Sequence, residues 1–297
     1  MPQETSDDKK AEKKASFRAR LVSTLVLWFL VLGVFVSGNA VAVAATIALI
    51  TILALWEWSR LWSSKADRGC LLAMVSVGTL YLIWEIISIA QDNGPAEGGE
   101  WTALIIGVVV IFTVRLRKGI DGIEAVTSVA VSLLGLVFLG LLLGGGLIKL
   151  SQLETPRGGQ WFMLLVVATT KFTDMGAYLV GSAIGRNKMI PHISPGKTWE
   201  GFFGALLVSQ IAVWLVRWGA GEHLVWAPQG IWLVLLGLIL AVGAVVGDLA
   251  ESLLKRSLAA KDSGQVLPGI GGVLDLVDSI CFTAPLAWVY LRFFGIG

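Results

Sequence analysis

Residues 230–256 read GIWLVLLGLILAVGAVVGDLAESLLKR, an apolar run that leads directly into a group of charged residues. A transmembrane helix needs about 20 predominantly apolar residues, and the run over 230–247 is close to that length. We therefore predict a membrane-spanning helix here, with a polar segment following it at one membrane surface.

The composition of the whole chain agrees with this prediction. Hydrophobic residues make up 56% and charged residues 15% of the 297 residues, and the mean hydropathy is +0.78. Soluble domains contain about 25% charged residues. We therefore expect an all-α, polytopic integral membrane protein. The predicted spans, nine in all, lie near 19–36, 40–62, 70–90, 101–114, 124–148, 160–183, 199–217, 230–247 and 279–295.

Lysine and arginine are concentrated in every second connecting segment, and the alternate segments are glycine-rich, acidic or nearly neutral. The positive-inside rule places the basic segments in the cytoplasm. The N-terminus is then cytoplasmic and the C-terminus outside, which requires an odd number of spans. We expect a disordered cytoplasmic tail over 1–17, N-terminal transmembrane helices over 18–158, and a C-terminal region over 159–297 with a polar site facing the cytoplasm.

Asp174 lies inside an otherwise apolar predicted helix, three residues after Lys171. An ionisable residue within a membrane span is costly, and it is a functional candidate by default. The alternative is an ion pair between Lys171 and Asp174 that only joins helices, since residues three apart share a helix face.

The segment Ser194-Pro-Gly-Lys-Thr-Trp-Glu-Gly201 is predicted to be a loop that ends at a helix N-terminus. Thr198 can cap that helix, and Glu200 suits the positive end of the helix dipole. A helix N-terminus beside Lys197 is suited to binding phosphate. The alternative is an ordinary capped helix after a basic loop. The Walker A spacing is absent.

A polar stripe follows the apolar run over 230–247. At about 100° per residue, Asp248, Glu251, Ser252 and Lys255 fall within about a third of the helix circumference. The alternative is a solvated amphipathic helix, but Asp248 directly adjoins the apolar run.

The segment 255–279 then brings lysines, aspartates and a glycine turn together in one short window. Asp275 and Asp278 are three residues apart at the start of the last predicted span, so in a helix they would point the same way and could share a metal. Glycines allow close backbone approach to phosphate, and cations neutralise it. This pattern indicates phosphate chemistry at a membrane surface.

The cysteines and histidines indicate little chemistry. Cys70 and Cys281 both lie in apolar segments and are expected to be buried hydrophobic residues. His192 and His223 are too far apart in the chain to suggest a zinc site. His192 lies beside the 194–201 segment and is a weaker candidate for contacting phosphate.

At these residues the chain resembles the phosphatidate cytidylyltransferase family, also called CDP-diacylglycerol synthases. The resemblance covers roughly 165–285 and includes Asp174-x-Gly-Ala-Tyr178, the 194–201 segment and Gly247-Asp248-x-x-Glu-Ser252. The residues that match the family's C-terminal signature are Ser252, Lys255, Arg256, Lys261, Asp262, Gly264, Pro268, Gly269, Gly271, Gly272, Asp275 and Asp278.

Two positions depart from that signature. Ile270 stands where the family has histidine, and Leu276 stands where it has arginine, so those roles cannot be transferred to this chain. Phosphoryl-type transfer depends mainly on positioning and charge neutralisation. We therefore expect activity to survive both departures.

The resemblance implies that CTP and phosphatidate react to give CDP-diacylglycerol and pyrophosphate, with Mg²⁺ and room for a second cation such as K⁺. It implies catalytic roles for Asp248, Asp275, Asp278, Lys255 and Lys261. It implies metal binding by Asp248, Asp275, Asp278 and Asp174. It implies nucleotide or substrate binding by Ser194, Lys197, Thr198, Glu251, Ser252, Arg256, Asp262, Gly269, Gly271 and Gly272. Phosphatidate would enter from the inner leaflet of a bacterial-type inner membrane, no nucleic acid is expected, and a homodimer fits the resemblance.

Two alternatives remain from the sequence. A CTP-dependent polyprenol or phytol-type lipid kinase would share the metal site and differ in its lipid acceptor. An ion-coupled transporter would use Asp174 and Lys171, but transporters place such charges near the midplane of two related halves. The Asp-Gly-x-x-Ala-Arg pattern of the CDP-alcohol phosphotransferases is missing, since Asp121-Gly122 lacks the rest.

Overall fold

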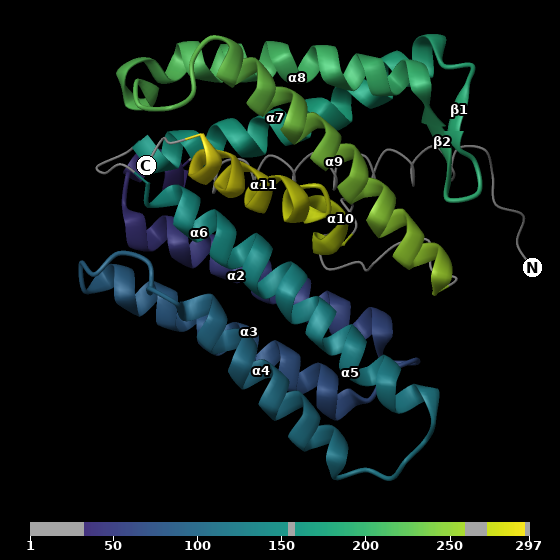
Figure 1. Ribbon diagram of the computed structural model, residues 1–297. Coiled ribbons are helices and arrows are strands. Elements are labelled where there is room, and N and C mark those ends of the chain that lie inside the picture. Colours follow the sequence, from purple (N-terminus) through teal and green to yellow (C-terminus); the bar gives the residue numbers. More distant parts are fainter. Residues whose placement is uncertain (1–32, 154–157, 259–271, 295–297) are drawn as a thin grey trace, which may run out of the picture.

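The computed structural model describes residues 33–153, 158–258 and 272–294 (Figure 1). The helices and strands in chain order are α2 (Ala40–Trp62), α3 (Arg68–Ala90), α4 (Gly99–Leu116), α5 (Ile123–Gly135), η1 (Leu136–Gly145), α6 (Gly146–Ser151), α7 (Gly158–Ile184), β1 (Lys188–Ile190), β2 (Ser194–Thr198), α8 (Trp199–Ala220), η2 (Gly221–Leu224), α9 (Ile231–Ser257), α10 (Val273–Val277) and α11 (Ile280–Phe293). The fold is therefore all-α apart from one short antiparallel hairpin.

Eight helical segments within these described residues are long and apolar enough to cross a membrane. One of them joins α5, η1 and α6 over Ile123–Ser151, and another joins α10 and α11 over Val273–Phe293. These eight correspond to the last eight predicted spans and confirm a polytopic membrane protein. The first predicted span, 19–36, lies mostly outside the described residues, although residues 33–37 are helical.

Large apolar side chains on the outside of the helix bundle agree with a lipid environment. On α4, Trp101 is 70% exposed, Ile105 62% and Val109 60%, and this spacing of four residues follows one face of the helix. Leu55, Met74 and Leu136 are fully buried in the interior. A helix with apolar residues on its exposed face is expected where the solvent is hydrocarbon.

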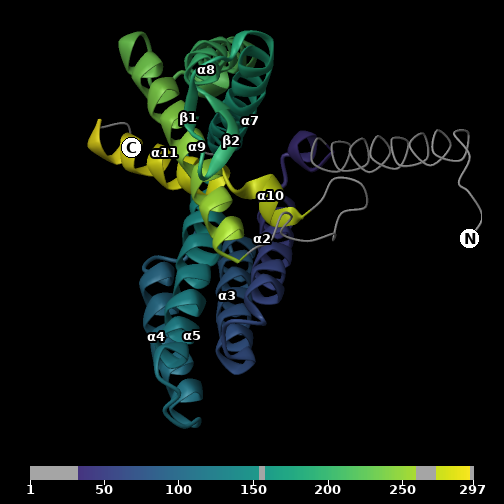
Figure 2. The ribbon, with the colours of Figure 1, turned by 90° about the vertical axis from the view of Figure 1, so that its right-hand side faces the viewer.

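Glycines allow α7 and α8 to pack closely along their length. A Cβ atom added at Gly204 would lie 2.4 Å from the Cβ of Val180, and one at Gly176 would lie 2.6 Å from the Cβ of Val208. Small residues at such contacts let membrane helices approach one another. Figure 2 shows α7 and α8 at one end of the molecule and α3, α4 and α5 at the other, with α10 and α11 between them.

The basic connections lie at one end of the helices. Figure 1 shows the hairpin of β1 and β2, helix α10 and the start of α5 on its right-hand side. Because successive spans run in opposite directions, the C-terminal end of α2 and the N-terminal end of α3 belong to this same end. The site is built here.

Candidate active site

Three carboxylates meet where α9 lies beside α10 and α11. Oxygen atoms of Asp248, Glu251 and Asp278 lie within 4.8 Å of one another. Asp248 and Glu251 come from α9, and Asp278 comes from the turn between α10 and α11. Glu251 is 8% and Asp278 9% exposed, so two of the three are nearly removed from solvent.

Gly247 permits this meeting of helices. A Cβ atom at this position would lie 2.8 Å from the Cα of Ser279 and 3.0 Å from the carbonyl oxygen of Asp278. Any larger residue would therefore meet backbone atoms, which cannot move independently of the turn. The glycine brings the α9 backbone against the turn that holds Asp278, and it adjoins Asp248 in the chain.

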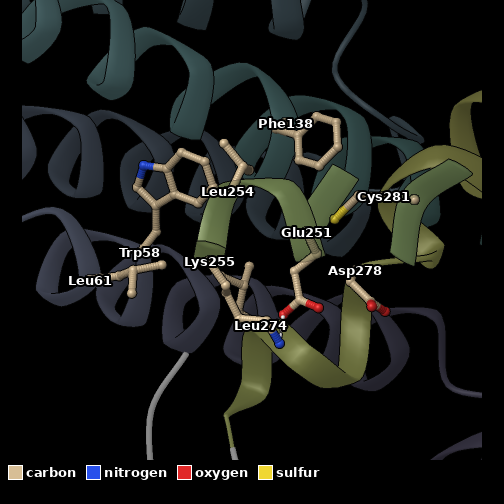
Figure 3. A pocket seen from close by; sticks show the side chains of 10 residues that line it. Trp58, Leu61, Phe138, Glu251, Leu254, Lys255, Leu274, Asp278 and Cys281 are labelled. Carbon is tan, nitrogen blue, oxygen red and sulfur yellow. Dashed lines mark ion pairs between the residues drawn. The ribbon is translucent and has the colours of Figure 1, made fainter. Parts of the chain in front are cut away.

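Lysines are paired with these carboxylates. The Nζ of Lys197 lies 2.9 Å from Oδ2 of Asp248, and it also donates a hydrogen bond to the carbonyl oxygen of Val245 at 3.2 Å. The Nζ of Lys255 lies 3.1 Å from Oε1 of Glu251 and 3.0 Å from Oδ1 of Asp275. Figure 3 shows the Lys255 ammonium beside the Glu251 carboxylate, with Asp278 nearby. These pairs reduce the repulsion between negative charges in a poorly solvated region.

Asp275 is held differently from Asp278. Its carboxylate accepts a hydrogen bond from the backbone N–H of Gly272 at 3.4 Å and pairs with Lys255. The three-residue spacing predicted that Asp275 and Asp278 would share a metal, but the structure groups Asp278 with Asp248 and Glu251. The role of Asp275 as a direct metal ligand stays a prediction.

Asp174 approaches the same place from α7. The hydroxyl of Ser279 donates to Oδ1 of Asp174 at 3.4 Å, and Nζ of Lys171 lies 3.7 Å from Oδ2. Ser279 is the residue after Asp278, so this bond joins α7 to the turn that carries the catalytic candidate. The ion pair between Lys171 and Asp174 that the sequence suggested is therefore present beside the carboxylate cluster.

A cavity of about 450 Å³ lies next to the carboxylates. Its walls come from α7, the hairpin, the start of α8 and α9. The polar residues that line it are Asp174, Tyr178, Ser182, Lys188, Ser194, Lys197, Thr198 and Asp248. Such a space, lined by both lysines and carboxylates, can hold a charged phosphate compound beside a metal.

The hairpin delivers the N-terminus of α8 to this cavity. The segment Ser194–Thr198, predicted to be a loop, is strand β2 and pairs with β1, with Lys188 opposite Thr198. Thr198 is the N-cap of α8, as predicted, and its hydroxyl accepts from the backbone N–H of Gly201 at 3.2 Å. The Glu200 carboxylate accepts from the side chain of Asn187 at 2.7 Å, which fixes the hairpin to the helix. The positive end of α8 thus lies at the cavity.

The remaining predicted residues lie on α9, at α10 or outside the described residues. Ser252 and Arg256 lie on α9, with Arg256 exposed, and Gly272 is the N-cap of α10. Leu276, at the position of the family's arginine, packs against the apolar core. Lys261, Asp262, Gly269, Ile270 and Gly271 lie outside the described residues, so their roles stay predictions.

Two residues beside the site were not singled out as site residues from the sequence. Lys188 lines the cavity from β1. Glu57, at the far end of the sequence from the site, is 1% exposed and accepts a hydrogen bond from the backbone N–H of Leu274 at 2.7 Å. A lone glutamate inside the predicted span 40–62 was the available signal, because a charge within a membrane helix is seldom incidental.

The site therefore brings metal ligands and phosphate-binding groups together. Carboxylate oxygens are the ligands that hard divalent cations such as Mg²⁺ prefer, and the cluster of three fits such an ion. Lysines and a helix N-terminus suit phosphate groups. Together they can hold a nucleoside triphosphate beside a metal ion at the end of a set of membrane helices.

Comparison with known proteins agrees with this chemistry. The model of the cytidylyltransferase family matches residues 18–294. The chain is 30% identical to a phosphatidate cytidylyltransferase of Synechocystis, over 84% of this chain and 87% of that protein. It is 32% identical to one of Pseudomonas aeruginosa, over 91% of this chain and 94% of that protein. An uncharacterized Escherichia coli protein, YnbB, is 36% identical over 46% of this chain and 44% of its own length. Since the family model spans nearly the whole chain, including every residue of the site, the chain belongs to the cytidylyltransferase family.

Proposed function

We propose that this protein transfers CMP from CTP to phosphatidate, giving CDP-diacylglycerol and pyrophosphate for phospholipid synthesis. The observation that supports this most directly is the cluster of Asp248, Glu251 and Asp278 beside a cavity of about 450 Å³ that also contains Lys188 and Lys197. The relatives that cover most of the chain are named as phosphatidate cytidylyltransferases.

We propose Mg²⁺ as the metal, held by Asp248, Glu251 and Asp278. The donor set consists of hard oxygen atoms from three carboxylates, which fits Mg²⁺ better than a softer metal. Asp174 accepts a hydrogen bond from the hydroxyl of Ser279, the residue after Asp278, and so lies beside the cluster, where it could supply a further oxygen. A bound divalent ion would neutralise charge on the attacking and leaving phosphate oxygens. The involvement of a second cation such as K⁺ is part of the same proposal.

The residues of the chain position the two substrates. A phosphatidate oxygen attacks the α-phosphorus of CTP, the bond from that phosphorus to the bridging oxygen breaks, and pyrophosphate leaves. Lys188 and Lys197, together with the N-terminus of α8, neutralise the triphosphate in the cavity. Lys255 holds Glu251 and Asp275 in place through its two ion pairs.

We propose that the site faces the cytoplasm of a bacterial-type inner membrane. The basic connections lie at the same end of the helices as the carboxylates, and the positive-inside rule puts that end in the cytoplasm. CTP is then available from the cytoplasm, and phosphatidate reaches the site from the inner leaflet. A homodimer is a further expectation from the family.

Purified protein in detergent will test the reaction. We expect labelled CTP and phosphatidate to be converted only when a divalent metal is present, with CDP-diacylglycerol and pyrophosphate as products. A lipid kinase would instead release CDP and a phosphorylated alcohol, so product analysis separates the two reactions. Activity that persists in excess chelator would contradict the proposed metal.

The variant Asp278→Asn will test the proposed centre. Asparagine keeps an oxygen that can accept the backbone N–H of Ser279, which lies 2.5 Å from Oδ1 of Asp278, so the fold should survive. The charge for the metal is lost, and we expect turnover to fall by more than about 100-fold, since even residues that only orient metal ligands typically contribute about 10- to 100-fold. An active Asp278→Asn enzyme would exclude Asp278 as an essential metal ligand.

A further inference from the structure

A buried glutamate on α2 lies apart from the residues so far given catalytic roles. Glu57 is 1% exposed and sits near the C-terminal end of α2, between apolar residues of the same helix. Removing a carboxylate from solvent costs several kcal/mol unless it gains strong partners. Its burial therefore needs a compensating interaction.

One partner that compensates for this burial comes from the opposite end of the sequence. The backbone N–H of Leu274 donates to Oε2 of Glu57 at 2.7 Å, across 217 residues. Leu274 is the second residue of α10, and its N–H is one of the first-turn donors that have no acceptor within their own helix. A carboxylate is a strong acceptor for such a donor, because the hydrogen bond is charge-assisted.

The same residue holds the backbone of Asp278. The N–H of Asp278 donates to the carbonyl oxygen of Leu274 at 3.0 Å. Two consecutive hydrogen bonds therefore connect Glu57, Leu274 and Asp278. Trp58 and Leu61, on the same helix as Glu57, line one small gap together with Glu251, Lys255 and Leu274, so α2 lies beside α9 and α10 here (Figure 3).

We propose that Glu57 is a positioning residue for the carboxylate centre. It holds the first turn of α10 so that Asp278 is presented to Asp248 and Glu251 at the spacing a divalent ion requires. This proposal rests on the proposed function for the identity of the metal, but the geometry of the centre can be measured without turnover. A glutamate that only joined α2 to α10 would affect stability and leave metal binding unchanged.

Three variants and a matched control test the proposal. Glu57→Ala removes the acceptor, Glu57→Leu fills the space without one, and Glu57→Gln keeps an amide oxygen at the same position. Glu85 is the control: it is fully buried in α3, it accepts a backbone N–H from Ala96 at 2.9 Å, and it lies at the opposite end of the helices. Glu85→Ala therefore removes a buried carboxylate of the same kind far from the centre.

The first measurement is metal binding by purified protein. Binding is monitored by Mn²⁺ electron paramagnetic resonance and by the rise in melting temperature during Mg²⁺ titration. Residues that orient metal ligands typically change metal affinity by about 10- to 100-fold when replaced. We expect that loss of affinity in Glu57→Ala and Glu57→Leu, a smaller loss in Glu57→Gln, and wild-type affinity in Glu85→Ala. The second measurement is turnover, where KM for CTP at saturating metal should change less than the half-saturating Mg²⁺ concentration.

Several results would overturn the proposal. One is unchanged metal affinity in Glu57→Ala, and another is an equal loss in Glu57→Ala and Glu85→Ala. If Glu57→Ala and Glu57→Leu fail to fold, Glu57→Gln decides: wild-type metal affinity in that folded variant rejects the proposal, and a weaker affinity supports it. Wild-type protein that binds no metal rejects it as well. Wild-type protein that binds metal but does not convert CTP and phosphatidate rejects the proposed reaction alone, and the metal titrations of the variants still decide the role of Glu57.

Discussion

The site contains more carboxylates than ammonium groups paired with them. The carboxylates are those of Asp174, Asp248, Glu251, Asp275 and Asp278, and the ammonium groups paired with them are those of Lys171, Lys197 and Lys255. The carboxylates outnumber their paired lysines, so the group as a whole favours a cation. Screening by solvent is weak there, because Glu251 and Asp278 are nearly buried.

Lys197 is both an ion-pair partner of a carboxylate and a cation at the cavity. It pairs with Asp248 and faces the cavity, and its side chain is 18% exposed. A hydrogen bond to a charged group contributes about 1.5–3 kcal/mol, which corresponds to roughly 10- to 100-fold in an equilibrium or rate ratio. We expect Lys197→Met to lower kcat/KM for CTP by that factor. Lys197→Arg keeps the charge but not the compact geometry, so it should recover only part of the loss.

Lys118 provides the control for that measurement. It forms an ion pair with Asp67 in a different connection at the same end of the helices. Lys118→Met removes an ion pair of the same type away from the cavity, and should leave kcat/KM for CTP close to that of the wild type. Equal kinetic effects of Lys197→Met and Lys118→Met would mean that Lys197 does not act on the nucleotide.

Helix α9 is the element on which the site depends most. It supplies Asp248 and Glu251 to the carboxylate cluster and Lys255 to Asp275, all from little more than two turns. Its contact with the turn at Asp278 and Ser279 is made through Gly247, which has no side chain to separate them. The spacing of the carboxylates therefore depends on how closely α9 approaches α10 and α11.

Two glycines one turn apart on α9 can test that dependence. A Cβ at Gly247 would lie within 3.0 Å of backbone atoms of Asp278 and Ser279, whereas the close contact of a Cβ at Gly243 would be with the end of the Leu286 side chain, at 2.5 Å. The Leu286 side chain can rotate away, but the backbone of the turn cannot. A displacement of about 1 Å in an active site can reduce the rate by about 100-fold. We expect Gly247→Ala to lower kcat by more than about 10-fold, and Gly243→Ala to stay near the wild type.

The measurement is turnover of both variants at saturating substrates, with a melting curve for each. A comparable melting temperature in the two variants would show that the loss in Gly247→Ala comes from the site. If Gly247→Ala were as active as Gly243→Ala, close approach of α9 would not be needed for the carboxylate centre.

At the scale of the whole molecule, features that depend on local sequence could be predicted. The spans predicted from residue 40 onward correspond to helices, because a helix that crosses a membrane needs about 20 mostly apolar residues and such a run is visible in the sequence. Thr198 was recognisable as a cap, and the polar stripe on α9 was recognisable from helical periodicity. The ends of the helices could not be predicted from apolar length, since the span predicted over 230–247 belongs to α9, which continues to Ser257.

Features that depend on contacts between distant segments could not be predicted in the same way. Helical spacing predicted that Asp275 and Asp278 share a helix face, but it could not show that Asp248 and Glu251 of α9 meet Asp278, or that Lys255 holds Asp275 to α9. The hydrogen bond from Leu274 to Glu57 joins α10 to α2, and no local pattern in either segment encodes it. The burial of Glu57 was visible only as a charge in an apolar run, without any indication of its partner.

The orientation of the molecule in the membrane can be tested with single introduced cysteines. Ser64, between α2 and α3, and Asn93, between α3 and α4, are both exposed and lie at opposite ends of α3. The native thiols, Cys70 and Cys281, are fully buried and should give little background labelling. We expect a membrane-impermeant maleimide to label Asn93→Cys in intact cells, and to label Ser64→Cys only after the membrane is permeabilised.

Labelling of Ser64→Cys in intact cells would contradict the proposed orientation, because Ser64 and the carboxylate centre belong to the same end of the helices. The site would then open to the outside, where CTP is not supplied. Labelling of Ser64→Cys only after permeabilisation would place the basic connections, the cavity and the nucleotide at the cytoplasmic face of the membrane. Phosphatidate in that leaflet and CTP in the adjoining water would then meet at the end of α9, where the apolar run gives way to Asp248 and Glu251.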